Sequence, residues 1–219
     1  WRKKGIWNLV YSAHLNLTKS SKALYKKADT FSKLAKTHGY RSRSAIKLLE
    51  IQKKDNFIKP RAKVLDLGSS PGGWSQVSNE IVGKNGLIFG VDKKIMQPLK
   101  SVHFVNKGLE NLCESDFEVL NENILPFDVV LSDIAPNISG IRDRDNALMD
   151  AILIEIRQCI DNFLKVEGTA LCKVFHGENF DKLMIYMKTN FQKVKIRKPD
   201  SSRANSKETY ILGVGKKKW

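Results

Sequence analysis

The chain has 219 residues, of which 42% are hydrophobic, and its 38 Lys and Arg against 23 Asp and Glu give a formal charge of +15. That length supports one α/β domain with a continuous core. No apolar run approaches the ~20 residues that a membrane span needs, and the first residues lack a signal-peptide pattern. Three cysteines and four scattered histidines have no metal-type spacing. We therefore expect a cytoplasmic protein with no bound metal and no membrane partner.

The expected elements alternate between strand and helix behind a basic N-terminal extension over residues 1–28. Residues 30–57 are expected to form one or two helices, with Gly39 as the break. Expected strands cover 63–67, 87–91, 102–106, 127–132, 169–174, 193–197 and 209–214, and expected helices cover 74–82, 146–163 and 179–189. This alternation predicts an α/β fold with a mostly parallel seven-stranded sheet and helices on both faces, in a single domain over residues 29–219.

The most informative stretch is residues 64–76, Val-Leu-Asp-Leu-Gly-Ser-Ser-Pro-Gly-Gly-Trp-Ser-Gln. A strand, a glycine-rich turn and a helix start form the place where an open α/β sheet holds a nucleotide-like ligand. Gly68, Gly72 and Gly73 let the backbone turn sharply and approach that ligand closely. Asp92 ends the next strand, 24 residues after Gly68. A carboxylate there is placed to accept both hydroxyls of a ribose, which predicts an adenosine derivative.

Two classes of adenosine ligand compete for this turn. A dinucleotide needs G-x-G-x-x-G, but here Ser69, Ser70 and Pro71 follow the first glycine, and Pro71 lacks a backbone donor for phosphate. Asp66 adds a negative charge that repels phosphate and suits the sulfonium and ammonium groups of S-adenosylmethionine. The residues favour S-adenosylmethionine over a dinucleotide. The third interpretation is a tight strand–helix turn that has no role in ligand binding.

The surplus of positive charge indicates a polyanionic partner. A lysine-rich proteome is an alternative explanation, because 29 of the 38 basic residues are Lys. The distribution favours nucleic acid: basic residues cluster in 41–61, 193–207 and 216–218, whereas acidic residues concentrate between 110 and 161.

Three charged residues stand where catalysis is expected. Asp133 follows the strand 127–132, and a polar residue at the carboxyl end of a central strand faces the ligand crevice. Lys173 lies inside an apolar strand, which is costly unless the lysine is paired or catalytic. Glu208 precedes the last strand. Each alone is equally well explained as a buried ion pair or a strand-end charge, but together they indicate a reaction site.

Five segments in order resemble the FtsJ/RrmJ family of S-adenosylmethionine-dependent RNA ribose 2′-O-methyltransferases, and within it the bacterial type that acts on 23S ribosomal RNA. They are residues 40–48, 65–76, 132–140, 173–177 and 194–208. The resemblance runs from about residue 29 to residue 217. It implies a Rossmann-like class I methyltransferase fold, with S-adenosylmethionine as cofactor and S-adenosylhomocysteine as product.

The family's catalytic set carries over as Lys47, Asp133, Lys173 and Glu208. The resemblance makes Lys173 the general base for a ribose 2′-hydroxyl. The alternative is that Lys173 stays a fixed cation while Asp133 takes the proton. Cys172 next to it is expected to point to the opposite face of the strand as a small buried hydrophobe, which disfavours methylation of a base carbon.

The cofactor contacts implied by the family are Gly72, Trp74, Asp92 and Asp133, to which the residues of the turn add Asp66, Gly68 and Gly73. One position departs from the family. Where an Asp usually meets the adenine amino group, this chain has Asn106-Lys107-Gly108. Asn106 and Glu110 are the two candidates to replace it.

Two basic groups are expected to bind phosphates at the mouth of the crevice. They are Arg41 and Arg43 on one side and Arg197, Lys198 and Arg203 on the other. The resemblance implies a monomer that methylates a uridine ribose in large-subunit ribosomal RNA during ribosome assembly, on free RNA or on the subunit. The alternatives are a 2′-O-methyltransferase of tRNA or another RNA, and a non-catalytic assembly factor that binds ribosomal RNA.

Overall fold

A computed structural model of the chain describes residues 30–119, 122–137, 139–202 and 206–218. The predicted N-terminal extension over residues 1–28 lies outside this range. Residues 30–37 are helical, and Gly39, with φ of 74°, ends that helix before α3 (Ser44–Asp55) begins. The break predicted at Gly39 is therefore present, because a positive φ is easily reached only without a Cβ.

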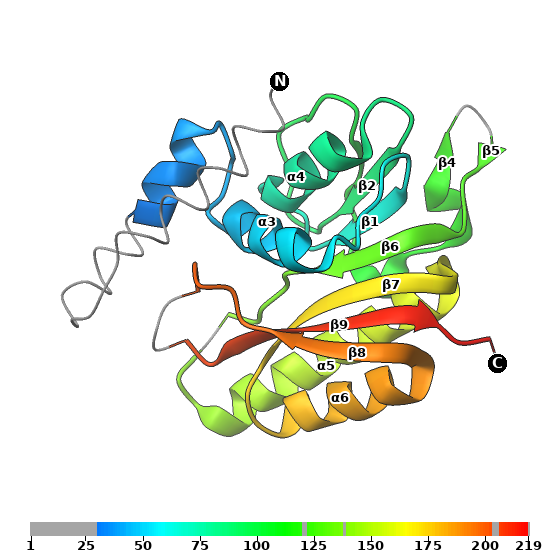
Figure 1. Cartoon of the computed structure of the whole chain (residues 1–219). Helices are drawn as coiled ribbons and strands as arrows, with labels where there is room; N and C mark the ends of the chain where they lie inside the picture. The colour runs from blue at the N-terminus through cyan, green and yellow to red at the C-terminus, as the bar shows by residue number, and fades with distance from the viewer. Residues whose placement is uncertain (1–29, 120–121, 138, 203–205, 219) are drawn as a thin grey trace.

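A seven-stranded sheet with the order β3-β2-β1-β6-β7-β9-β8 runs through the molecule (Figure 1). Its strands are β1 (Lys63–Leu67), β2 (Leu87–Val91), β3 (His103–Val105), β6 (Phe127–Ser132), β7 (Leu164–Phe175), β8 (Phe191–Arg197) and β9 (Glu208–Lys216). Only β9 is antiparallel to its neighbours β7 and β8. The predicted mostly parallel seven-stranded sheet is confirmed.

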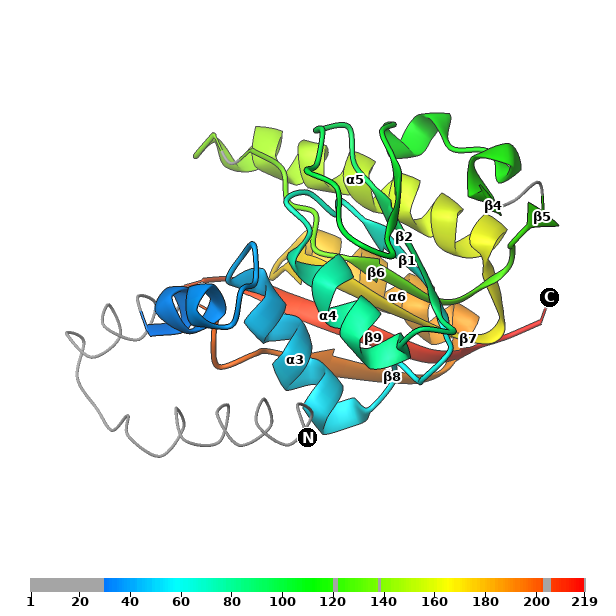
Figure 2. The same ribbon diagram turned by 90° about the horizontal axis from the view of Figure 1, so that it is seen from above.

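Helices cover both faces of this sheet, as the two views in Figures 1 and 2 show. On one face, α3 and α4 (Gly73–Val82) pack onto the sheet through side chains such as Ile46, Leu49 and Val77. On the other face, α5 (Arg142–Phe163) and α6 (Glu178–Asn190) do so through side chains such as Leu153 and Leu183. Two hydrophobic layers therefore enclose the strands, which explains their almost uninterrupted apolar sequences.

Between β3 and β6 the chain forms short elements beside the edge of the sheet. They are two 3₁₀ turns, η1 (Leu109–Asn111) and η2 (Glu114–Phe117), and a small hairpin of β4 (Glu118–Val119) and β5 (Glu122–Asn123). No helix in the described ranges has an apolar stretch long enough to cross a bilayer.

Two elements are longer than their sequence pattern predicts. Helix α5 begins at Arg142 rather than at 146, because its polar first turn carries Asp143 and Asp145, which favour a helix N-terminus. Asp145 also accepts a hydrogen bond from the backbone N–H of Ser139, at 2.8 Å. Strand β7 begins at Leu164, where it pairs with Phe127 across an irregularity in the register. Neither segment has an apolar period, so tertiary pairing decides its structure.

The order of the strands fixes where a ligand can bind. From β1 the chain moves outward to β2 and β3 and then returns to β6 on the other side of β1. At this reversal the connections leave β1 and β6 in opposite directions, which opens a crevice at their carboxyl ends. Gly68 follows β1 and Asp133 follows β6 at this point.

Candidate active site

Two buried ion pairs meet at the carboxyl edge of the sheet. The Nζ atom of Lys47, on α3, lies 2.5 Å from the Oε1 atom of Glu208 at the start of β9. The Nζ atom of Lys173, on β7, lies 3.2 Å from the Oδ1 atom of Asp133. The side chains of all four are at most 17% exposed. Four residues from distant parts of the sequence thus form one charged cluster beneath the surface.

Tyr210 connects the two ion pairs, and the sequence analysis did not identify it. Its hydroxyl donates a hydrogen bond of 2.7 Å to the Oδ1 atom of Asp133, and the Lys47 ammonium lies 6.0 Å from the centre of its ring. Burial, together with the charge of Asp133, raises the pKa of this fully buried phenol well above its usual value. Tyr210 therefore remains a hydrogen-bond donor at neutral pH.

The period of two residues in a strand could have revealed Tyr210. Tyr210 stands two positions after Glu208, so both side chains emerge on the same face of β9. The register of the sheet places Tyr210 beside the other ion pair, because Tyr210 lies opposite Lys173 in the β7–β9 ladder. Its apolar ring made it an ordinary core residue on sequence alone.

Glu208 is held as a carboxylate. Burial by itself would raise its pKa, but the ammonium of Lys47, a hydrogen bond from the Ser202 hydroxyl at 2.8 Å and the charge of Lys173 outweigh it and lower the pKa below the usual value. Such a carboxylate is a poor proton acceptor near neutral pH, so its chemical task is to hold the Lys47 cation in place.

The amine of Lys173 makes two contacts with Asp133. Besides the contact with the carboxylate of Asp133, it donates a hydrogen bond of 3.0 Å to the backbone carbonyl of Asp133. This fixes the end of a flexible side chain beside the first residue of the loop after β6. The neighbouring Cys172 points to the other face, into the cluster with Leu183 and Met187, and burial raises the pKa of its thiol to about 12.

A cavity of about 650 Å³ opens beside this cluster, at the carboxyl ends of β1, β2 and β6. Gly68, Asp92 and Asp133, three of the predicted cofactor residues, line it. Gly68 has φ of 71°, and a Cβ there would collide with the side chain of Ile134. The carboxylate of Asp92 accepts hydrogen bonds from the backbone N–H groups of Ser70 and Lys94, at 3.0 and 2.8 Å. The wall of the cavity is therefore fixed before any ligand binds.

The other four residues predicted to bind the cofactor, Asp66, Gly72, Gly73 and Trp74, are not among those that line the cavity. Their direct contact with a ligand stays a prediction. Asp66 is buried and accepts a hydrogen bond of 2.6 Å from the Ser75 hydroxyl. Burial and the charges of Asp133 and Asp92 raise its pKa to about 7, although the Ser75 hydrogen bond acts against this.

Gly72, Gly73 and Trp74 join the start of α4 to its neighbours. A Cβ on Gly72 would meet the side chains of Leu99 and Met96, and one on Gly73 would collide with the Ser42 hydroxyl. The Trp74 indole donates a hydrogen bond of 2.8 Å to the backbone carbonyl of Ser44, and its ring lies 5.7 Å from that of Tyr210. These contacts place α3, and with it Lys47, against the glycine-rich turn.

At the position where the family's adenine contact is missing, the two candidate residues differ in their partners. The amide of Asn106 donates a hydrogen bond of 2.8 Å to the backbone carbonyl of Asp92. The carboxylate of Glu110 lies against Gly108, which lines the cavity, and a Cβ on Gly108 would collide with both of its oxygen atoms. Glu110 thus places a carboxylate in the space that a side chain at position 108 would occupy.

The residues predicted to bind RNA divide into two groups. The guanidinium of Arg41 donates to the backbone carbonyls of Pro71, Gln97 and Pro98, at 3.2, 2.5 and 2.7 Å. That of Arg197 forms two hydrogen bonds of 2.6 and 2.7 Å with the carboxylate of Asp55. Both are thus occupied by the protein itself, because backbone acceptors and a carboxylate satisfy a guanidinium as phosphate would. They first hold loops in place, and RNA contact by them stays a prediction.

The described part of the chain includes two of the remaining predicted RNA contacts, Arg43 and Lys198. Arg43 immediately precedes α3, and the Nζ atom of Lys198 donates a hydrogen bond of 3.1 Å to the backbone carbonyl of Ser206. Arg203 lies outside the described residues. In the described part of the chain, no three His, Cys, Asp or Glu side chains are arranged to hold a metal ion.

The strand order, the glycine-rich turn after β1 and the cavity at the switch point define a Rossmann-like α/β fold with a ligand site at the switch point. Residues 40–216 match the model of the FtsJ-like methyltransferase family. The chain belongs to this family.

Two relatives illustrate the similarity. A Marinobacter nauticus protein named ribosomal RNA large subunit methyltransferase E is 42% identical over 187 residues, which cover 85% of this chain and 90% of that protein. The solved structure of a Plasmodium falciparum protein, regarded as a ribosomal RNA methyltransferase, is 29% identical. It matches with a TM-score of 0.69 over 81% of this chain and 98% of its own.

A more distant structure shares the fold alone. Aeropyrum pernix fibrillarin, solved with natively bound S-adenosyl-L-methionine, is 16% identical and matches with a TM-score of 0.55. The match covers 80% of this chain and 75% of that one.

Proposed function

We propose that this methyltransferase transfers a methyl group from S-adenosylmethionine to the ribose 2′-hydroxyl of a uridine in large-subunit (23S) ribosomal RNA. The observation that carries this proposal is the meeting of two buried ion pairs, Lys47–Glu208 and Lys173–Asp133, at the edge of the cavity. A lysine and a carboxylate held beside a ligand site suit the deprotonation and orientation of a hydroxyl group.

The residues of the cavity fit the proposed cofactor. Asp92 offers carboxylate oxygens to ribose hydroxyls, and Gly68 lines the same cavity. Asp133 and Glu155 add carboxylates to a lining that also includes Lys93, Lys94 and Lys107, so we expect the positive groups of the ligand on the side of the carboxylates. When bound, S-adenosylmethionine supplies an electrophilic methyl group.

For the adenine amino group we propose Glu110 as the acceptor. The amide of Asn106 is turned toward the backbone carbonyl of Asp92, whereas the Glu110 carboxylate, which accepts a hydrogen bond of 3.2 Å from Asn111, lies against Gly108, a residue that lines the cavity. Glu110→Ala should weaken S-adenosylmethionine binding several-fold in calorimetric titration, and Asn106→Ala should have a smaller effect. The reverse order of the two effects would assign the contact to Asn106.

In the proposed reaction the amine of Lys173 is the general base and accepts the proton of the 2′-hydroxyl as the oxygen is methylated. Asp133, fixed by Tyr210, orients this amine through two contacts. Lys47, fixed by Glu208, places a positive charge where the oxygen develops negative charge.

The donor contacts of Lys173 favour a second mechanism, in which it remains an ammonium and orients the hydroxyl while Asp133 takes the proton. Lys173→Arg distinguishes the two, since arginine stays charged at any accessible pH. A variant that keeps a near-normal rate identifies a fixed cation, and one without turnover but with intact cofactor affinity identifies a base.

The RNA substrate is supported by charge and by similarity. A formal charge of +15 suits a polyanion, and the 42% identical relative is named for large-subunit ribosomal RNA. The buried thiol of Cys172, with its raised pKa, argues against a thiolate that would attack a base carbon. The intact cluster of four charged residues argues against a non-catalytic assembly factor.

The decisive experiment incubates the protein with isotope-labelled S-adenosylmethionine and large ribosomal subunits from a strain that lacks this enzyme. Nuclease digestion should place the label on the ribose of one uridine, and Lys173→Ala should abolish it. Label on a base, or only in tRNA, would contradict the assignment. A protein that binds the particles without labelling them would indicate the non-catalytic role.

A further inference from the structure

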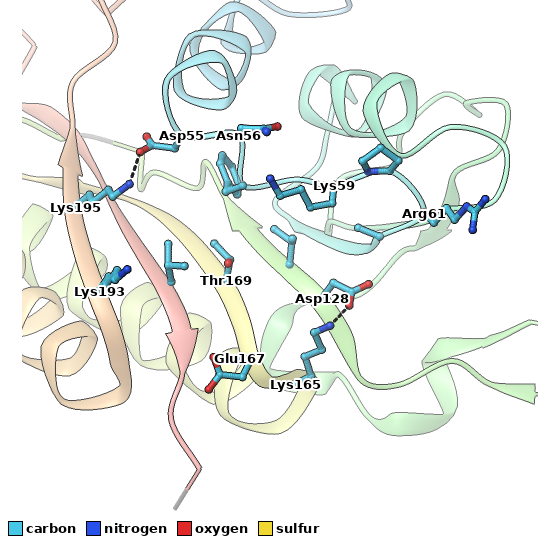
Figure 3. Close-up of a pocket in the computed structure, with 15 residues that line it drawn as sticks. Asp55, Asn56, Lys59, Arg61, Asp128, Lys165, Glu167, Thr169, Lys193 and Lys195 are labelled. Atoms are coloured by element: carbon cyan, nitrogen blue, oxygen red, sulfur yellow. Dashed lines mark hydrogen bonds and ion pairs between the residues drawn. The ribbon is translucent and has the colours of Figure 1, made fainter.

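A second cavity, of about 610 Å³, lies at the end of the sheet opposite the proposed active site (Figure 3). Its walls are the connection from α3 to β1, the beginnings of β6 and β7, and the side of β8 next to the end of β9. Along β9, Val214 in this groove lies six positions after Glu208 of the charged cluster, which corresponds to about 20 Å. The groove is therefore a separate surface.

The carboxylates that line the groove are already satisfied by donors of the protein. Asp55 accepts hydrogen bonds from Lys195 at 2.9 Å and from Arg197 at 2.6 Å. Asp128 pairs with Lys165 and accepts the backbone N–H of Lys63 at 2.7 Å. Glu167 accepts a hydrogen bond of 2.6 Å from the Gln192 amide. The charges of Asp55 and Asp128 are thus balanced by cations of the protein, whereas Glu167 has a neutral donor and keeps its negative charge.

Three cations of the groove have no partner for their side chains among the described residues. Lys59, Arg61 and Lys193 are exposed, and within the described residues no carboxylate or carbonyl accepts a hydrogen bond from their side chains. Figure 3 shows Lys59 and Lys193 on opposite sides of Thr169, with Arg61 further along the groove. Unpaired positive charge on both sides of a polar groove favours an anion between them.

We propose that this groove binds a phosphodiester segment of the RNA substrate, remote from the nucleotide that is methylated. Phosphate oxygens in protein–RNA complexes are contacted by lysine, arginine, threonine and asparagine side chains, and Thr169 and Asn56 line the groove beside the three cations. The identity of the anion rests on the proposed function. The groove would hold the RNA at a second point and so position it without taking part in the chemistry.

The test compares Lys59→Gln, Lys193→Gln and the double variant with Lys188→Gln, which removes the same charge from the exposed side of α6 on the other face of the sheet. The probe is protein-free transcribed 23S ribosomal RNA, and binding is measured over a series of salt concentrations. At about 0.1 M salt the double variant should bind roughly tenfold more weakly. The slope of log K against log salt should fall by about 1.5.

Three further results decide the interpretation. S-adenosylmethionine affinity and the rate at saturating RNA should be unchanged in the double variant, because the groove is remote from the chemistry. Unchanged RNA affinity and salt slope, or an equal loss in Lys188→Gln, would overturn the proposal. A loss seen with large subunits but not with protein-free RNA would assign the groove to a ribosomal protein instead.

This test stays separate from that of the proposed function, because it measures binding without methyl transfer. A protein that binds the RNA through the groove but methylates nothing would contradict the proposed function alone. Wild-type protein that fails to bind the RNA would overturn the groove as an RNA site.

Discussion

Glu208→Gln tests the Lys47–Glu208 ion pair of the proposed catalytic cluster. The substitution keeps the shape of the side chain but removes the charge that lies 2.5 Å from the Lys47 ammonium. With an effective dielectric constant of about 20, two unit charges at that distance attract by roughly 6–7 kcal/mol, before the cost of desolvation. Removing one partner of a buried pair costs about 3–5 kcal/mol. Because the amide oxygen still accepts hydrogen bonds from Lys47 and Ser202, we expect a loss of about 3 kcal/mol.

The measurement is the free energy of unfolding in urea at pH 7, for Glu208→Gln, Lys47→Met and the double variant. Each single variant leaves a buried charge without its partner, whereas the double variant leaves no unpaired charge at these two positions. The double variant should therefore lie within about 1–2 kcal/mol of wild type, and the cycle should show a coupling energy. A Glu208→Gln variant less than about 1 kcal/mol below wild type would refute the reasoning.

The pH dependence gives an independent check on the same pair. The pKa of Glu208 is lower in the folded protein than its usual value. Its contribution to stability is therefore complete above about pH 4.5 and is lost as the pH falls through the folded pKa. The stability difference between wild type and Glu208→Gln should be constant near neutral pH and shrink below pH 4. A difference that persists at low pH would mean that the loss comes from packing rather than from charge.

Three further predictions follow from single contacts. Tyr210→Phe removes a hydrogen bond to the Asp133 carboxylate, which is worth about 1.5–3 kcal/mol. We therefore expect kcat to fall about tenfold or more, while cofactor affinity in calorimetry stays nearly constant. An unchanged kcat would contradict a positioning role for Tyr210. Arg41→Ala frees the loop carbonyls of residues 97 and 98, so it should weaken cofactor binding several-fold without changing the salt slope of RNA binding. A smaller salt slope would identify Arg41 as a phosphate contact. Asp66 has a pKa of about 7 in the folded protein, above the unfolded value near 4, so its contribution is complete below pH 4 and is lost as the pH rises to about 7. Asp66→Asn should lack this loss in urea titrations from pH 4 to 8, and parallel curves for the two proteins would contradict the raised pKa.

Much of the architecture could be predicted because it depends on local pattern. The run Val-Leu-Asp-Leu of β1, the glycine-rich turn and the start of α4 are neighbours in the chain, so strand, turn and helix signals coincide there. The switch point follows from the order of such units. The polar first turn of α5 and the extended start of β7 were missed, because their structure depends on caps and pairing rather than on hydrophobic period.

Local sequence pattern is sufficient to predict the strand–helix alternation, the glycine-rich turn and the four charged residues. Their partners depend on the folded arrangement, in which Glu208 holds Lys47, Tyr210 donates to Asp133, and Arg41 binds loop carbonyls. A backbone conformation is set largely by a residue's own side chain and its near neighbours. The charge state and hydrogen bonds of a side chain are set by whatever lies within a few ångströms, and in a folded sheet those groups come from elements far apart in the chain.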